Sequence, residues 1–133
     1  MLQLSVIIFR NIERKILLQF RDSGAPSEAL GWSFFGGIAE GNETPLEAIV
    51  REVKEELDMA IVPSDVHLLA KEHWISPNSG KEKIVHLYEG TASLDWSHSR
   101  VLEGAGAAFL TKDEVASMEN VSLLAKTFIA KYC

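Results

Sequence analysis

The chain has 133 residues, of which 47% are hydrophobic and 24% are charged. This length and composition are typical of one globular domain with a buried core, so we expect residues 1–133 to form a single domain. Thirteen basic residues against nineteen acidic ones give a net charge of -6, which excludes a general attraction to nucleic acid or to an anionic membrane surface. If the ligand is a small polyphosphate, so acidic a protein needs a divalent cation between itself and that ligand.

The sequence gives no reason to place the protein outside the cytoplasm. Cys133 is the only cysteine, which excludes an intramolecular disulfide and a thiolate metal cage. The apolar start, residues 2–9, lacks the basic leader and the small-residue cleavage site of a signal peptide, and no run reaches transmembrane length. We therefore expect a cytoplasmic protein. A homodimer is compatible with the sequence, which offers no proof of one.

The first third of the chain predicts strands separated by loops. Residues 2–9 alternate with the period of a strand, and residues 16–20 form a second apolar run after a polar stretch. We predict that these two strands pair as a hairpin. Residues 21–31 have the glycines and the proline of an exposed loop, and residues 32–35 lead into Gly36-Gly37, which we place at a strand end.

The rest of the chain begins with a strong helix signal. Thr44 can cap the first turn, Pro45 suits the first helical position and Glu47 completes a capping box, which predicts a helix to Leu57. Later elements are predicted as strands at 66–75, 84–88 and 107–110, a short helix from the capping box at 111–114 to about 118, and a last helix within 122–131. Together these elements predict an α/β protein with one mixed sheet covered by helices.

The predicted helix after Thr44 has an apolar stripe and an acidic surface. At roughly 100° per residue, the stripe that faces the sheet contains Leu46, Ile49, Val50, Val53 and Leu57. Three carboxylates fall within an arc of about 100° that faces away from the centre of this stripe: Glu52, Glu55 and Glu56.

The carboxylate surface has two interpretations. The simpler one for an isolated helix is a solvated acidic face that Arg51 and Lys54 partly neutralise. The alternative is a metal site, because like charges at these spacings repel one another while a hard divalent cation binds such oxygen ligands. The preceding Gly36-Gly37 favours the metal site, since glycine lets the backbone approach the same carboxylates.

The segment from Gly37 to Met59 closely resembles the Nudix box, a signature that runs from a glycine through a loop into a helix. The matching positions are Gly37, Glu43, Arg51, Glu52, Val53, Glu55, Glu56 and Met59. Asp58 departs from the pattern at the end of the helix, where the family usually has glycine and where a left-handed conformation is common. The departure concerns the exit from the helix and leaves the carboxylates in place.

The resemblance implies a three-layer α/β/α sandwich and hydrolysis of the pyrophosphate linkage in a nucleoside diphosphate linked to a further group X. It implies Mg²⁺, with Mn²⁺ as the alternative, held by Glu52, Glu55 and Glu56 directly or through water, and a site completed by the Gly37 carbonyl. Glu52 is the first candidate to orient or deprotonate the attacking water, which a bound metal makes a stronger nucleophile. Nucleoside triphosphates, ADP-ribose and nucleotide sugars share this chemistry, and the box does not distinguish them.

Two residues beside these acids are expected to support them. Arg51 belongs with the catalytic set and can pair with Glu47 or Glu55 at four-residue spacing, with a phosphate contact as the alternative. Glu43 can brace the loop against the helix N-terminus, where negative charge is favoured, and we do not expect it to be a ligand.

Substrate contacts are predicted outside the box. Arg21 is expected to reach a phosphate, and Trp32 or Phe34 to stack on a base, although core packing is the simpler interpretation of aromatic residues near a strand. In many members of the family a later loop acid assists catalysis, and the candidates here are Glu103 first, then Asp95 and Glu89. The competing functional class is a non-catalytic module on the same fold that binds a nucleotide metabolite.

Overall fold

The computed structural model of the chain describes residues 1–21, 31–77, 79–90 and 106–133. In chain order the elements are β1 (Leu2–Ile8), β2 (Ile16–Arg21), β3 (Gly31–Ser33), β4 (Phe35–Ile38), α1 (Pro45–Leu57), the 3-10 turn η1 (Pro63–Asp65), β5 (Val66–Ile75), β6 (Glu82–Gly90), β7 (Gly106–Leu110), α2 (Lys112–Ser117) and α3 (Leu123–Tyr132). The predicted strands and helices therefore occur where the sequence places them, to within about two residues at most ends. The predicted loop at 21–31 falls mainly on residues 22–30, outside the described residues.

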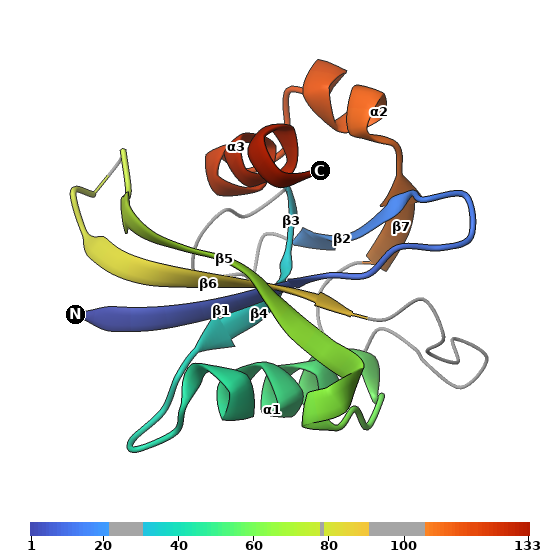
Figure 1. Ribbon diagram of the computed structural model, residues 1–133. Coiled ribbons are helices and arrows are strands. Elements are labelled where there is room, and N and C mark those ends of the chain that lie inside the picture. Colours follow the sequence, from blue (N-terminus) through green and yellow to red (C-terminus); the bar gives the residue numbers. More distant parts are fainter. Residues whose placement is uncertain (22–30, 78, 91–105) are drawn as a thin grey trace.

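The strands divide between two sheets. The larger sheet has the order β4-β1-β6-β5 and the smaller one the order β3-β2-β7. The larger sheet is mixed, as predicted, because β1 is antiparallel to β4 and parallel to β6. Helix α1 lies on one side of the strands and α3 on the other (Figure 1). The α/β sandwich is confirmed, with two sheets where the sequence suggested one.

The predicted hairpin of β1 and β2 is wrong beyond its turn. The turn is closed by hydrogen bonds from Asn11 N to Lys15 O (3.1 Å) and from Leu17 N to Phe9 O (2.9 Å). Past this point β1 is flanked along its length by β4 and β6, so both of its edges are occupied. β2 therefore diverges and becomes the central strand of the smaller sheet.

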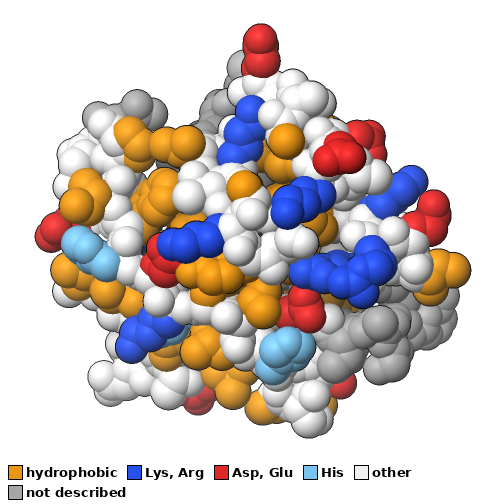
Figure 2. Space-filling model, turned by 45° about the horizontal axis from the view of Figure 1, so that its top comes forward, with side chains coloured by type: hydrophobic (Ala, Val, Ile, Leu, Met, Phe, Trp, Pro, Cys, Tyr) orange, Lys and Arg blue, Asp and Glu red, His pale blue; other side chains and the backbone are white. Residues whose placement is uncertain are grey.

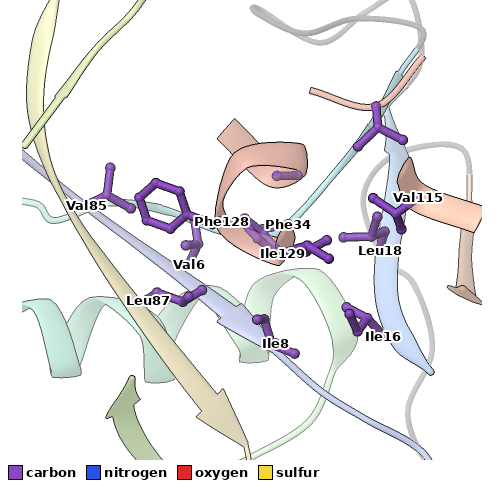
Figure 3. Close-up of a cluster of buried hydrophobic side chains, with 12 residues drawn as sticks. Val6, Ile8, Ile16, Leu18, Phe34, Val85, Leu87, Val115, Phe128 and Ile129 are labelled. Atoms are coloured by element: carbon purple, nitrogen blue, oxygen red, sulfur yellow. The ribbon is translucent and has the colours of Figure 1, made fainter. Parts of the chain in front are cut away.

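The core consists of two apolar clusters on opposite sides of the strands. Successive side chains of a strand point to opposite faces, so Val6 and Ile8 join one cluster while Ile7 and Phe9 join the other. The first cluster packs under α3 through Phe128, as Figure 3 shows. The second cluster packs under α1 and places that helix against the sheet.

Capping boxes fix where α1 and α2 begin. Thr44 Oγ1 accepts from Glu47 N (3.1 Å) and Glu47 Oε1 accepts from Thr44 N (2.9 Å), the reciprocal pair of a capping box. Thr111 and Glu114 form the same arrangement before α2. Within the part of the chain that the structure describes, no helix is long and apolar enough to cross a membrane.

Candidate active site

Helix α1 places the carboxylates at three different depths. The side chain of Glu55 is 48% exposed and that of Glu52 is 14% exposed, whereas Glu56 is only 5% exposed. The prediction that Glu56 faces away from the core is therefore wrong. Seven residues span almost two helical turns, so Glu56 lies only about 20° from the buried Ile49 on the helix surface.

The buried Glu56 carboxylate is held by donors from both sheets. Its Oε1 accepts from the backbone N–H of Gly36 in β4 (2.9 Å), and its Oε2 accepts from Gln19 Nε2 in β2 (3.2 Å). Gln19 Nε2 also donates to the carbonyl of Phe34 (3.0 Å). The sequence analysis missed Gln19, although a lone amide inside the apolar run of residues 16–20 was a usable signal.

The glycine pair lies inside β4, which corrects its predicted place at a strand end. Gly36 has φ +146°, and a Cβ there would meet the carbonyl oxygen of Ser5 in the neighbouring strand β1. A Cβ at Gly37 would instead fall on the carboxylate of Glu52. The predicted close approach of backbone and carboxylate is therefore present, and it requires the absence of a side chain at Gly37.

Arg51 ties the loop before the helix to the acids on it. Its guanidinium contacts Glu43 through Nε (2.8 Å) and Nη2 (2.9 Å), and Nη1 donates to Glu52 (2.9 Å) and to Glu55 (3.2 Å). Of the two partners predicted for Arg51, the structure shows Glu55, while Glu47 is used in the cap.

This network shifts the pKa of both main partners. The Arg51 hydrogen bonds lower the pKa of Glu43 from 4.5 to about 2, with a smaller contribution from the Glu40 N–H. The Glu43 carboxylate raises the pKa of Arg51 in turn, so the pair stays ionised across the physiological range. Glu43 thus braces the loop, as expected from its place before the helix.

A cavity of about 740 Å³ adjoins these groups. Glu52 and Glu56 line it on the side of α1, together with Gly36 and Gly37. Other parts of its wall come from β1, from the β5–β6 hairpin and from the start of α3; the lining side chains outside the acidic side include Leu4, Val6, Arg21, Ser33, Phe34, Trp74, Lys83 and Leu123. The structure therefore places Arg21 beside the acids, and it adds Trp74 and Lys83, which the sequence analysis missed.

Other predicted contacts fall outside this cavity or in the core. Trp32 is not among the lining residues and packs against Phe20, with ring centroids 5.3 Å apart. Phe34 lines the cavity, but it is only 4% exposed and belongs to the apolar cluster under α3. Glu89 forms an ion pair with Arg10 (3.0 Å). Glu103 and Asp95, the other acids considered for a catalytic role, lie outside the described residues.

Asp58, the departure from the Nudix pattern, closes α1 in the conformation usually given to glycine. It has φ 53° and ψ 35°, and its N–H donates to the carbonyl of Lys54 (3.1 Å). Its carboxylate accepts from Lys54 Nζ (2.8 Å). Aspartate tolerates this left-handed conformation better than most residues do, so the helix ends as the family pattern requires.

The donors around the cavity suit a hard divalent cation. Glu52 and Glu56 both line this cavity with carboxylate oxygens, and the lack of a side chain at Gly37 leaves room for the Glu52 carboxylate beside β4. Oxygen ligands are those that Mg²⁺ and Mn²⁺ prefer. Among the described residues, no three His, Cys, Asp or Glu side chains form a ready-made metal cluster. Glu52 and Glu55 both accept from Arg51 instead. A cation would therefore share these acids with Arg51.

Comparison with known proteins agrees with this geometry. The model of the NUDIX domain matches residues 1–130. The solved MutT protein of Methanosarcina mazei has a TM-score of 0.82 at 20% identity, over 98% of this chain and 91% of that one. A MutT NUDIX hydrolase of Burkholderia pseudomallei has a TM-score of 0.72 at 21% identity, over 97% and 98%.

A third solved structure, a NUDIX hydrolase of Nitrosomonas europaea, has a TM-score of 0.76 at 20% identity, over 98% of this chain and 87% of that one. At these identities the structural likenesses establish the fold. No curated protein gives a significant match. The match of the domain model over nearly the whole length shows that this chain belongs to the Nudix hydrolase family.

Proposed function

We propose that this Nudix hydrolase cleaves the pyrophosphate linkage of a nucleoside diphosphate bonded to a further group X, and that it requires Mg²⁺ or Mn²⁺. One observation carries the proposal. Glu52 and Glu56 line the same cavity as Gly36 and Gly37 of β4 and as two cationic side chains, Arg21 and Lys83. Acids and cations around one cavity suit a ligand that is anionic and arrives with a metal.

The carboxylates have separate tasks in this mechanism. A divalent cation, when bound, would be held by Glu52 and Glu56, with Glu55 and the Gly37 carbonyl as further ligands, and would polarise the phosphoryl oxygens. Glu52 is the acid we assign to orient the attacking water, because its carboxylate lies against β4 and is partly open to the cavity. Arg51 holds Glu52 and Glu55 in place.

The remaining cavity wall suits the organic part of a nucleotide. Lys83 and Trp74 face one another in register across β5 and β6, which brings a cation and an aromatic ring to one part of the wall. Trp74 is half-buried and packs edge-on against Phe128, with centroids 5.8 Å apart. We assign Arg21 and Lys83 to phosphate oxygens and Trp74 to the base or to group X. Trp32 does not line this cavity, so its stacking on the base stays an untested prediction.

A small ligand also fits the surface charge better than a polymer does. On the face shown in Figure 2, basic and acidic side chains are interspersed among hydrophobic ones. Such a face offers no extended cationic surface to a nucleic-acid backbone. With a net charge of -6, this agrees with a free nucleotide as substrate. Action in the cytoplasm stays a prediction. Assembly into a homodimer stays an open prediction.

The test is turnover of a panel containing nucleoside triphosphates, ADP-ribose and nucleotide sugars, with Mg²⁺, with Mn²⁺ and with a chelator. We expect metal-dependent release of a nucleoside monophosphate and a phosphorylated fragment, or of pyrophosphate from a triphosphate, identified by mass. Glu52→Gln should abolish turnover, whereas Glu82→Gln, an exposed acid that lies outside the cavity lining, should not. Tight binding of one compound without turnover would indicate the binding module instead.

A further inference from the structure

A buried amide lies at the point where the two sheets meet the acidic helix. Gln19 is 3% exposed and occupies the central strand of the smaller sheet, opposite Ser33 on one side and Ala107 on the other. Leu17, on the same face of β2, belongs to the apolar cluster beneath α1. Burying an amide among apolar side chains is costly unless its hydrogen bonds are made. The position of Gln19 therefore calls for a specific partner.

The Gln19 side-chain amide donates two hydrogen bonds, one to the backbone beside β4 and one to Glu56. One goes to the carbonyl of Phe34 (3.0 Å), directly before β4, and the other goes to Glu56 Oε2 (3.2 Å). The other oxygen of Glu56 accepts from Gly36 N in the larger sheet (2.9 Å). With a donor on each oxygen, the plane of the carboxylate is fixed. A carboxylate oxygen has two lone pairs, so an oxygen that accepts a hydrogen bond can also be a metal ligand.

We propose that Gln19 is a positioning residue, which holds the Glu56 carboxylate in the orientation that binds the divalent cation. The inference rests on the proposed function. An amide suits this task because it is neutral, so it orients the carboxylate without cancelling the charge that attracts a cation. Arg51 is different, since it brings a positive charge to Glu52 and Glu55. Partners of this kind behind a metal ligand typically change metal affinity by 10–100-fold.

The test compares two Gln→Met variants by their affinity for Mn²⁺ alone, measured by the loss of the free-ion electron paramagnetic resonance signal. Gln19→Met keeps the length of the side chain and removes the donor. Gln3→Met is the matched control, because Gln3 Oε1 lies 2.6 Å from His86 Nε2 in β6 and neither residue lines the cavity. We expect about tenfold or greater weakening of Mn²⁺ binding in Gln19→Met and wild-type binding in Gln3→Met.

Steady-state kinetics distinguish a role in metal binding from a general role in folding. If Gln19 acts through Glu56, the Mn²⁺ concentration needed for half-maximal turnover rises in Gln19→Met, while the KM for substrate at saturating Mn²⁺ stays near the wild-type value. Wild-type Mn²⁺ affinity in a folded Gln19→Met protein would overturn the inference. Should circular dichroism show that this variant is unfolded, Gln19→Asn takes its place, since it withdraws the amide from Glu56 by one methylene. Undiminished Mn²⁺ binding there would count equally against the inference.

The two proposals fail in distinguishable ways. A wild-type protein that neither binds Mn²⁺ nor turns over any substrate would overturn the proposed function, and the Gln19 inference with it. A wild-type protein with metal-dependent turnover, together with an unaffected Gln19→Met variant, would overturn only the role of Gln19.

Discussion

Alanine substitutions at the two glycines of β4 should have different effects: Gly36→Ala should mainly lower stability, and Gly37→Ala should mainly lower turnover. At Gly36, a Cβ would meet the Ser5 carbonyl and would lie 2.8 Å from Val6 Cα, both in the backbone of β1. That strand is held between β4 and β6 and has no free side toward which to move. Backbone strain at positive φ costs about 1–3 kcal/mol and overpacking a further 1–3 kcal/mol. Gly36→Ala should therefore lose about 2–6 kcal/mol of unfolding free energy.

At Gly37 the same added methyl should cost activity and little stability. The obstructing atoms belong to the end of the Glu52 side chain, which can swing away, so we expect a loss of less than about 1 kcal/mol. The displaced carboxylate would leave its place beside β4 and strain its contact with Arg51 (2.9 Å). A displacement of about 1 Å at a reacting centre can cost on the order of a hundredfold in rate, and we expect that loss in kcat.

Urea unfolding and metal-dependent turnover, measured on both variants, check this pair. Gly41→Ala is the control, because Gly41 has φ +54° and open space around its missing Cβ. It should lose about 1 kcal/mol from the left-handed conformation alone and keep its turnover. Equal losses of stability at Gly36 and Gly37 would refute the reasoning, and so would wild-type turnover in a Gly37→Ala protein.

Three further predictions follow from the same contacts. Glu56→Gln should fold but lose most turnover, and about 1–3 kcal/mol of stability, because one amide end would face a donor from Gly36 or Gln19; unchanged turnover would contradict the metal site. Glu43 has its pKa lowered to about 2, so its contribution to stability is present above pH 4.5 and is lost as the pH falls toward 2; urea unfolding between pH 6 and 3 should show a smaller acid-induced loss in Glu43→Gln than in wild type. Lys83→Met should raise KM by about tenfold with little change in kcat, as removal of one charged contact would, whereas Lys81→Met, outside the cavity lining, should leave KM unchanged.

The features that the sequence predicted well are those decided by neighbours along the chain. The capping boxes at Thr44 and Thr111 involve residues three apart, and both helices begin where those boxes place them. The predicted bounds of β5 are those observed. The close approach of backbone and carboxylate at Gly37 was also predicted, because the glycine pair precedes the acidic helix by a short segment and glycine lets the backbone come near.

The features that were missed depend on which strands become neighbours. A hairpin of β1 and β2 was the simplest pairing along the chain, and it failed because β1 is flanked by the distant β6. Lys83 and Trp74 meet only through the register of β5 and β6. Gln19 and Glu56 are 37 positions apart and come from different elements. Periodicity predicts the face on which a side chain lies, and it says nothing about the strand that will lie opposite.

The burial of Glu56 changes how the acidic helix should be understood. On the sequence alone, Glu52, Glu55 and Glu56 formed one acidic surface, which was either a metal site or a solvated face. In the structure, Arg51 binds Glu43, Glu52 and Glu55, while Glu56 is set into the core and held by the neutral donors of Gly36 and Gln19. A buried carboxylate costs free energy unless it is hydrogen-bonded, and the donors of Gly36 and Gln19 offset part of that cost for Glu56. Under the proposed function, a bound cation would stabilise this buried charge further, so we expect Glu56 to contribute more to metal affinity than the exposed Glu55 does.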